Sequence, residues 1–314
     1  MKTKSTPQDL TLIQLFDRFA TDEKARQHLE SVLWKKGIVC PHCECNDQGR
    51  FSGIKANPAK KIRAGLRHCS NCKKQFTVTI GTIFEDSHIP LRKWLIAWYL
   101  LCSSKKGVSS LQLQRQLEIG SYESALFMTH RIRFALKQTV FAEKLSGTIE
   151  ADETFVGGKS EGEGVQAGLK KKTIVMSMVQ RGGQVRSEVL PSVHGKNLRQ
   201  AISKHVQICS EVHTDDRLAY RSLEPKFTHK SVKHCANEFI RHEGETIVTT
   251  NSVESFFSLL KRGVIGTFHH ISPQYLPLYL AEFDHRHNCR KMTDGARTDA
   301  GLLQAAGKRL IYQA

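Results

Sequence analysis

The sequence predicts a multidomain protein, in which a small metal-binding ribbon and a helix-turn-helix region precede a larger α/β domain. Three observations support this prediction. Two C-x2-C pairs lie near the N-terminus, apolar residues follow helical spacing in much of the chain up to about residue 140, and an alternation typical of β-strands begins at residue 148. With 314 residues, the chain is long enough for two or three domains.

The charge balance favours a polyanionic partner. The chain has 47 Lys and Arg against 30 Asp and Glu, a net charge of +17, so nucleic acid is the expected partner. The longest apolar run covers residues 94–102, too short to span a bilayer, and the first ten residues have no apolar signal segment. We therefore expect a cytoplasmic, nucleoid-associated protein without a membrane partner, whose nine cysteines serve metal binding rather than disulfides.

Short helices are expected in residues 1–37, followed by a zinc ribbon in residues 38–82. Two C-x2-C pairs with 25 residues between the inner cysteines suit one tetrahedral Zn2+. Because four thiolates fill every position, such a zinc ion is structural. The predicted ligands are Cys40, Cys43, Cys69 and Cys72, and the neighbours close enough to substitute for one of them are Cys45, His42 and His68.

Residues 88–142 carry the pattern of a helix-turn-helix. A first helix ends near Ser103, a short helix covers 110–117, and a third begins with Ser121 as its cap. A short helix, a tight turn and a longer basic helix form the shape that enters a DNA major groove. A plain helical bundle with solvated cations is the alternative. The basic side chains expected on the third helix are His130, Arg131, Arg133 and Lys137.

An α/β domain is predicted for residues 146–290, followed by a polar tail in residues 291–314. Its helices are expected at 195–206, from about Asn251, and at 273–288. Its strands are expected at 148–156, 173–180, 185–190, 208–214 and about 228–234, with a hairpin turn at 181–184.

Acidic residues lie at the ends of three predicted elements of this domain. Asp152 is expected to end the first strand, Asp215 ends the fourth, and Glu254 lies in the first turns of the long helix. Three carboxylates at one point repel each other unless cations are present, and oxygen ligands suit Mg2+ or Mn2+. The sequence therefore predicts a divalent-metal site of the kind that supports phosphoryl transfer. For any one of these acids, a solvated surface position is the alternative.

The motifs of this chain resemble those of a known family. The chain is similar to bacterial insertion-sequence transposases with an N-terminal zinc ribbon and an RNase H-like DDE catalytic core, the ISXO2-like family. The matching stretches run from about residue 10 to 290 and are CPHC, CSNCKKQFTVTIGTIFEDSHIPLRKW, KKGVSSLQLQRQL, IEADETFVGGK, HTDDRLAYRSL and NSVESFFSLLKRGVIGTFHHISPQYLPLYLAEFDHRHN.

The resemblance implies roles for individual residues. Asp152 would be the first catalytic acid and Asp215 the second. The third would be Glu254 or Asn251, with Lys261 seven residues after Glu254. A charged oxygen neutralises metal ions better than an amide, which favours Glu254, whereas Asn251 is also a candidate helix cap. His285 stands where the family tends to have an aromatic residue, so the resemblance is weaker in the last helix.

Two further expectations concern the neighbourhood of Asp152. Gly157, Gly158 and Lys159 would begin a flexible basic loop, closed by residues 170–172, that approaches DNA. Because neighbours on a strand point to opposite faces, Glu153 should point away from Asp152, either as a supporting group or toward solvent.

Taken with the resemblance, these features predict a DNA transposase. It would act on double-stranded DNA, both the element ends and the target, with Mg2+ or Mn2+ as catalytic cofactor and Zn2+ as structural cofactor, as a homo-oligomer on DNA. One alternative is an RNase H-like metal nuclease such as a junction resolvase, which lacks only strand transfer. Another is a DNA-binding regulator with an inactive core.

Overall fold

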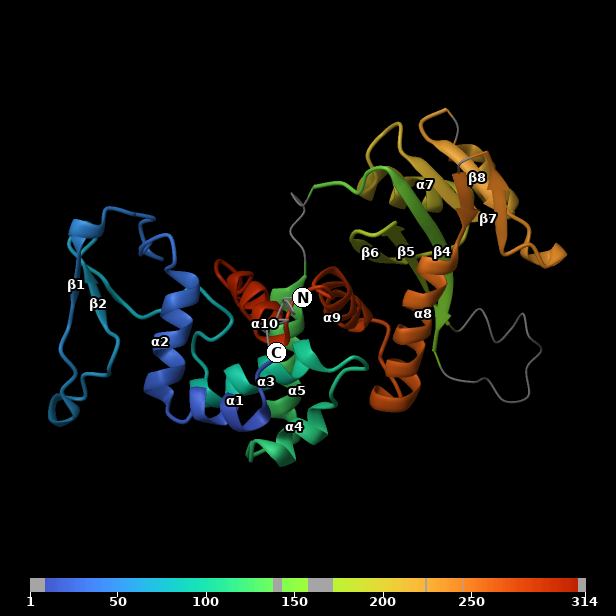
Figure 1. Cartoon of the computed structure of the whole chain (residues 1–314). Helices are drawn as coiled ribbons and strands as arrows, with labels where there is room; N and C mark the ends of the chain where they lie inside the picture. Colours follow the sequence, from blue (N-terminus) through green and yellow to red (C-terminus); the bar gives the residue numbers. More distant parts are fainter. Residues whose placement is uncertain (1–8, 138–142, 158–171, 224, 245, 310–314) are drawn as a thin grey trace, which may run out of the picture. The chain divides into compact units, whose positions relative to one another are not determined.

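The structure is a computed structural model that describes residues 9–137, 143–157 and 172–309, apart from residues 224 and 245. The chain divides into two compact units (Figure 1). The first takes its residues from Met1–Ser104, Val108–Leu136 and Lys291–Ala314, and the second from Lys105–Gly107 and Lys137–Arg290.

The first unit contains a three-stranded antiparallel ribbon. Its order is β1-β2-β3, and the 3-10 turns Gln48–Arg50 and Pro58–Lys60 flank β1. The small core of the ribbon consists of Phe76, the cysteines, and the rings of Trp34 and Phe51 packed edge-on against Phe76. So few apolar side chains cannot fold the ribbon without a metal. The strands are β1 (Phe51–Gly53), β2 (Arg67–Cys69) and β3 (Gln75–Phe76).

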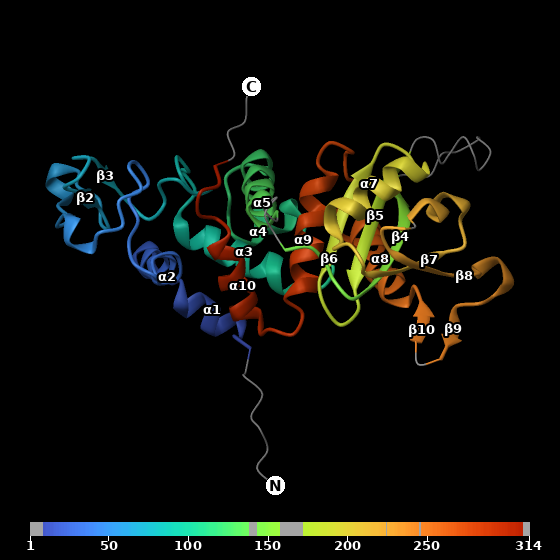
Figure 2. The same ribbon diagram turned by 90° about the horizontal axis from the view of Figure 1, so that it is seen from above.

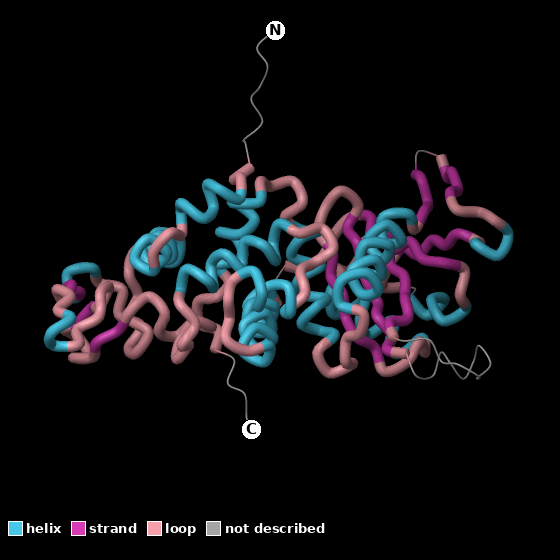
Figure 3. Tube along the Cα trace, turned by 90° about the horizontal axis from the view of Figure 1, so that it is seen from below, coloured by secondary structure: helices cyan, strands magenta, loops and turns pink. Residues whose placement is uncertain are grey.

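Helices make up the rest of the first unit (cyan in Figure 3). Helix α3 is apolar almost all round, with Trp94, Trp98 and Leu101 buried, so it lies in the centre and packs against α2, α5 and α10. Hydroxyl side chains of Thr11, Thr21 and Ser109 cap the starts of α1, α2 and α4. The bounds are α1 Leu12–Arg18, α2 Asp22–Leu33, α3 Leu91–Ser103, α4 Ser110–Gln116, α5 Tyr122–Leu136 and α10 Asp294–Leu303.

The segment after residue 290 differs from the polar tail that the sequence predicts. It contains helix α10, whose start is capped by the Thr293 hydroxyl and whose Leu302 is fully buried. The Arg297 guanidinium donates to the carbonyl oxygen of Cys102 at 3.0 Å. Only a few apolar residues anchor this helix, so its pattern in the sequence is weak.

Most basic side chains of α5 do not face solvent, contrary to the expectation for a groove-reading helix. His130, Arg131 and Arg133 are buried, and only Lys137 is exposed. Burial lowers the pKa of His130 to about 4, and Arg131 lies over the Trp94 ring while donating to the carbonyl oxygen of Glu85. The sequence pattern fails here because α5 packs against α3, α4 and α10, which bury these side chains together with their charged ends.

The second unit is built on a five-stranded mixed sheet of order β6-β5-β4-β7-β8 (Figure 2). Strands β4, β5 and β6 pair antiparallel, whereas β7 and β8 run parallel to β4. The strands are β4 (Thr148–Val156), β5 (Thr173–Gln180), β6 (Val185–Leu190), β7 (Glu211–Asp215) and β8 (Thr228–Val232). The first three have the predicted bounds.

Helices cover both faces of this sheet, which gives the predicted α/β layers. Helix α7 (Gly195–His205) packs on the face that carries Ile149 and Ala151. Helices α8 (Asn251–Gly263) and α9 (Leu276–Asn288) pack on the face that carries Val156. The apolar stripe predicted for α8 is confirmed by its buried residues Val253, Phe256, Phe257 and Leu260.

The connection between β8 and α8 contains elements that the sequence does not predict. A hairpin of β9 (Ile240–Glu243) and β10 (Thr246–Thr249) follows the short turn His234–Ala236. Another short turn, Leu218–Leu223, follows β7, and a π-turn, Val264–Phe268, extends α8. Within the part of the chain that the structure describes, no helix combines the length and the apolar character needed to cross a bilayer.

Candidate active site and zinc centre

The four predicted cysteines form a compact cluster in the ribbon. Their sulfur atoms all lie within 4.8 Å of one another. The Sγ atoms of Cys40 and Cys72 are 3.7 Å apart, and those of Cys43 and Cys69 are 3.8 Å apart. Four sulfurs at about 2.3 Å from a tetrahedral Zn2+ are about 3.8 Å from each other, so the cluster has the size of a zinc site.

Local backbone geometry brings the sulfurs together. After each C-x2-C pair, one residue adopts a left-handed conformation: Glu44 with φ 57° and Lys73 with φ 62°. Their backbone N–H groups turn back to the carbonyl oxygens of Cys40 and Cys69. The Asn71 amide donates to Cys43 Sγ, and this hydrogen bond is the main reason that the pKa of Cys43 falls to about 6. Such a thiol binds a metal readily.

The neighbouring candidate ligands lie outside this cluster. Among the described residues, only the four cysteines form a group of potential ligands this close together. His42 interacts through Nε2 with the carbonyl oxygen of Gln75.

Strand register places Asp152 beside Asp215. Glu150 on β4 is the parallel partner of His213 on β7. Two residues further along each strand come Asp152 and Asp215. Asp215 ends β7 as predicted, whereas Asp152 lies in the middle of β4 and not at its end, because the strand continues to Val156. Residues two apart on a strand share a face, so both aspartates lie on the face that α8 covers.

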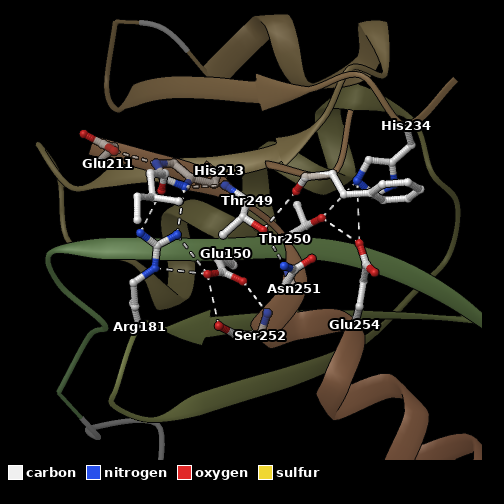
Figure 4. Close-up of polar contacts among 12 residues, drawn as sticks. Glu150, Arg181, Glu211, His213, His234, Thr249, Thr250, Asn251, Ser252 and Glu254 are labelled. Atoms are coloured by element: carbon white, nitrogen blue, oxygen red, sulfur yellow. Dashed lines mark hydrogen bonds and ion pairs between the residues drawn. The ribbon is translucent and has the colours of Figure 1, made fainter. Parts of the chain in front are cut away.

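Glu254 comes from α8 above this face. Its Oε1 accepts a hydrogen bond from the Thr250 hydroxyl at 2.8 Å and lies 3.6 Å from His234 Nε2 (Figure 4). The His234 ring is also 3.1 Å from Thr250 Oγ1. The Glu254 side chain remains 40% exposed, so a ligand from solvent can reach it.

Burial and neighbouring charges act on Asp152. Burial, together with the charges of Glu153, Asp215 and Glu254, raises the pKa of Asp152 to about 7, although the backbone N–H of Glu153 donates to its Oδ1 and lowers it. A bound cation would compensate these charges and favour the ionised form of Asp152. Oxygen donors of this kind fit Mg2+ or Mn2+ better than zinc.

The acids do not form a closed site like that of the cysteines. Asp152, Asp215 and Glu254 are not among the described ligand groups that lie within 4.8 Å of one another. Asn251 is the first residue of α8 and is exposed, while Thr250 is the helix cap. Lys261 is exposed in the last turn of the same helix.

Glu153 points to the opposite face, as the strand alternation predicts. Its side chain is fully buried and accepts hydrogen bonds from the Tyr220 hydroxyl at 2.5 Å and from Arg217 at 3.2 Å. Arg217 also lies 3.8 Å from Asp215. Glu153 is therefore a buried supporting group, and the alternative of a solvated position is wrong.

A second polar layer beneath the acids was not predicted from the sequence. Glu150, buried on β4, contacts Arg181 and Ser252, and Arg181 reaches His213 (Figure 4). A recognisable signal was present: Glu150 and His213 stand two residues before Asp152 and Asp215, on strand positions that the fold buries.

The predicted basic loop is described only at its two ends. Gly158, Lys159, Lys170 and Lys171 lie outside the described residues. Gly157 has φ 156°, and a β-carbon at this position would lie 3.2 Å from Lys172 Cγ.

Comparisons with known proteins match both regions. Residues 20–75 match the transposase zinc-ribbon domain, and residues 144–288 match the ISXO2-like transposase domain. A protein of Halobacterium salinarum, described as an uncharacterized protein in transposable element ISH50, is 26% identical over 289 residues, which is 85% of this chain and 91% of the relative.

One solved structure is also similar, the catalytic core domain of BIV integrase. It is 16% identical, and the match covers 44% of this chain and 81% of that chain at a TM-score of 0.29. At this TM-score the similarity gives no support to any assignment of function.

Residues 20–75 thus match a zinc ribbon of transposases, and residues 144–288 match a transposase domain, in the order that the sequence analysis expects. The family resemblance drawn from the sequence is confirmed, because the chain carries both domains of the ISXO2-like transposase family.

Proposed function

We propose that this protein cuts double-stranded DNA at the ends of its insertion element and joins the freed 3′-hydroxyl to target DNA. The observation that carries the proposal is geometric: Asp152 and Asp215 lie on neighbouring parallel strands, on the face of the sheet that α8, the helix of Glu254, covers. Carboxylates collected from distant parts of the sequence, in a domain of this family, are suited to hold the divalent ions of phosphoryl transfer.

The three acids would hold Mg2+ or Mn2+ between the middle of β4, the carboxyl end of β7 and the first turn of α8. When bound, such ions stabilise the attacking and leaving oxygens of an in-line displacement. Lys261 and Asn251 are exposed on the same helix as Glu254, so Lys261 would contact a DNA phosphate and Asn251 would support the approach of substrate.

Two displacements at phosphorus account for the reaction. In the first, a water oxygen bonds to phosphorus, the P–O3′ bond breaks, and the element end leaves as a 3′-hydroxyl. In the second, this 3′-oxygen bonds to a target phosphorus and a target 3′-hydroxyl leaves. Two reacting ends must be held together on DNA, for which we propose a homo-oligomer.

Recognition of the element end would fall to the first unit. The ribbon exposes Lys60, Lys61 and Arg63 on its central loop and Lys73 and Lys74 after the second cysteine pair, which suits contacts to phosphates. If the helix-turn-helix enters a groove, the exposed N-terminal part of α5 would do so, where Tyr122, Glu123, Ser124 and Phe127 are exposed.

The decisive experiment measures cleavage of a labelled element end with Mg2+ or Mn2+. Asp152→Asn should abolish cleavage and leave end binding nearly intact. Asp216→Asn is the matched control, because Asp216 is exposed beside Asp215 and should be dispensable. Wild-type cleavage by Asp152→Asn would refute the proposal. A target plasmid in the same assay separates transposase from nuclease, since only a transposase joins the end to the plasmid.

A further inference from the structure

The buried carboxylate of Glu150 lies next to the three acids but takes no part in the proposed reaction. Glu150 stands two residues before Asp152 on β4, and its side chain is 1% exposed. The Ser252 backbone N–H donates to its Oε2 at 2.6 Å, and the Ser252 hydroxyl donates to its Oε1 at 3.0 Å (Figure 4). Glu150 therefore binds the first turn of α8, where a carboxylate also benefits from the helix dipole.

Arg181 binds the other side of the same carboxylate. Its Nε and Nη2 atoms donate to Glu150 Oε1 at 3.1 and 3.0 Å, and its Nη1 donates to the carbonyl oxygen of Ile247 at 2.9 Å. Arg181 lies in the turn between β5 and β6 and Ile247 on β10. One guanidinium thus links the sheet to the hairpin that leads into α8.

His213 completes the layer from the neighbouring strand. Its Nδ1 is 3.3 Å from Arg181 Nη2 and accepts the Thr249 N–H at 3.4 Å, which leaves Nε2 to donate to Glu211. Thr249 precedes α8 by two residues. The residues two positions before both catalytic aspartates therefore hold the chain at the start of the helix.

Glu150, Arg181 and His213 are close enough to the three acids to control the distances between the acids. Ser252 and Glu254 are two residues apart on α8, about 3 Å along the helix axis, and Glu150 and Asp152 are two residues apart on β4, about 7 Å. Apolar side chains would hold a helix on a sheet at least as well as a buried ion pair does. What the hydrogen bonds add is a fixed position for the first turn of α8.

We propose that Glu150 is a positioning residue of the acid site: with Arg181 and His213 it fixes the start of α8 on β4 and so sets the separation of Glu254 from Asp152 and Asp215. This inference rests on the proposed role of those three acids in metal binding. It assigns Glu150 no contact with substrate or metal.

The test uses the full-length protein and Mn2+ alone, without DNA. Mn2+ affinity is measured by calorimetry and by the Mn2+ paramagnetic resonance signal. Glu150→Gln should weaken Mn2+ binding by about tenfold to a hundredfold, as is usual for groups that orient metal ligands. Glu282→Gln is the matched control: Glu282 is also fully buried and paired with an arginine, Arg286, but on α9. It should bind Mn2+ like the wild type.

A kinetic measurement separates positioning from a general structural role. In cleavage assays, Glu150→Gln should lower the rate with little change in KM for end DNA, and high Mn2+ should restore part of the rate. High Mn2+ should not rescue Asp152→Asn. If Glu150→Gln fails to fold, Ser252→Ala decides, because it removes only the hydroxyl donor and should weaken Mn2+ binding about twofold to fivefold.

The outcomes distinguish this inference from the proposed function. Wild-type Mn2+ affinity in folded Glu150→Gln, or in Ser252→Ala where that variant decides, would overturn the positioning role while leaving the acids in place. Absence of Mn2+ binding by the wild type, together with full cleavage by Asp152→Asn, would overturn the proposed function instead.

Discussion

The two candidate metal sites of this chain are built in opposite ways. The four cysteines of the ribbon come from two short knuckles, and their sulfurs are already within 4.8 Å of one another. The three acids come from β4, β7 and α8, are partly open to solvent, and interact mainly through their charges. A site that must hold one ion permanently is closed, whereas a site that must admit DNA phosphate remains open.

The largest effect on folding and DNA binding should follow from the loss of one zinc ligand in the ribbon. Cys43→Ser removes one thiolate, and the ribbon has little other core, so zinc and the folded ribbon should both be lost. Structural zinc contributes about 10–16 kcal/mol in small zinc domains. Metal analysis should find one zinc per wild-type chain and none in the variant, and binding of element ends should disappear. Cys45→Ser is the control and should retain both zinc and binding.

A zinc-free wild-type protein that binds element ends fully would contradict this assignment. It would also remove the contrast between a closed structural site and an open catalytic one.

The next effect distinguishes the two candidates for the third acid. Glu254→Gln should lower cleavage by on the order of a thousandfold or more, since several kcal/mol of charge stabilisation are lost with the carboxylate. Asn251→Ala should cost about tenfold, because Asn251 is an exposed first residue of α8 that carries no negative charge. Cleavage rates of both variants, with folding checked by circular dichroism, provide the comparison.

The reverse ranking would transfer the catalytic role to Asn251. In that case the acid site would contain two carboxylates and one amide, and the charge coupling of Glu254 to Asp152 would be incidental.

The contrast between the sites also explains how far the sequence could predict them. The cysteine site is local, so spacing alone identified all four members. The bounds of β5 and β6 were predicted correctly because two runs rich in Val, Ile and Met flank the turn at 181–184, which is a strong local signal. The hairpin β9–β10 was missed because it is short and several of its side chains are exposed.

The acid site needed information that no local pattern contains. Asp152 and Asp215 lie side by side because of the parallel register of β4 and β7. This register pairs positions that are 63 residues apart in the sequence. Glu150, Arg181 and His213 were missed because single polar residues in strands or turns look like solvated ones. The same difficulty affected the prediction that α5 carries exposed basic residues. A basic residue at a helical position does not show whether its side chain is buried, and those of His130, Arg131 and Arg133 are.

A smaller effect concerns stability against pH in the metal-free protein. Because the folded pKa of Asp152, about 7, exceeds the ordinary 3.8, the folded state binds this proton more tightly than the unfolded state. The resulting stabilisation of the folded state is fully present below about pH 4 and is lost as the pH rises toward 7. It amounts to roughly 4 kcal/mol, since each pKa unit corresponds to about 1.4 kcal/mol. Urea unfolding between pH 4 and 8 measures it.

Mg2+ at pH 8 should recover this stability, and Asp152→Asn should remove the part of the pH dependence that comes from Asp152, together with the recovery. Burial also raises the pKa of Asp284 to about 7, so part of the pH dependence has another origin. Asp284 accepts hydrogen bonds from Ser187 on β6, and its contribution should not respond to Mg2+. A pH dependence that Asp152→Asn leaves unchanged would show that the acid site is not electrostatically strained.

The smallest predicted effect tests whether Glu153, the residue after Asp152, contributes to the acid site. The Tyr220 hydroxyl donates to Glu153 on the far face of the sheet, where the Glu153 side chain is fully buried. Tyr220→Phe removes this donor from a buried carboxylate and should lower the free energy of unfolding by about 1.5–3 kcal/mol. Mn2+ affinity should stay within about twofold of the wild type, because Tyr220→Phe leaves the Glu153 carboxylate and its ion pair with Arg217 in place. A tenfold loss of Mn2+ affinity at unchanged stability would instead place Glu153, through Arg217 and Asp215, within the metal site.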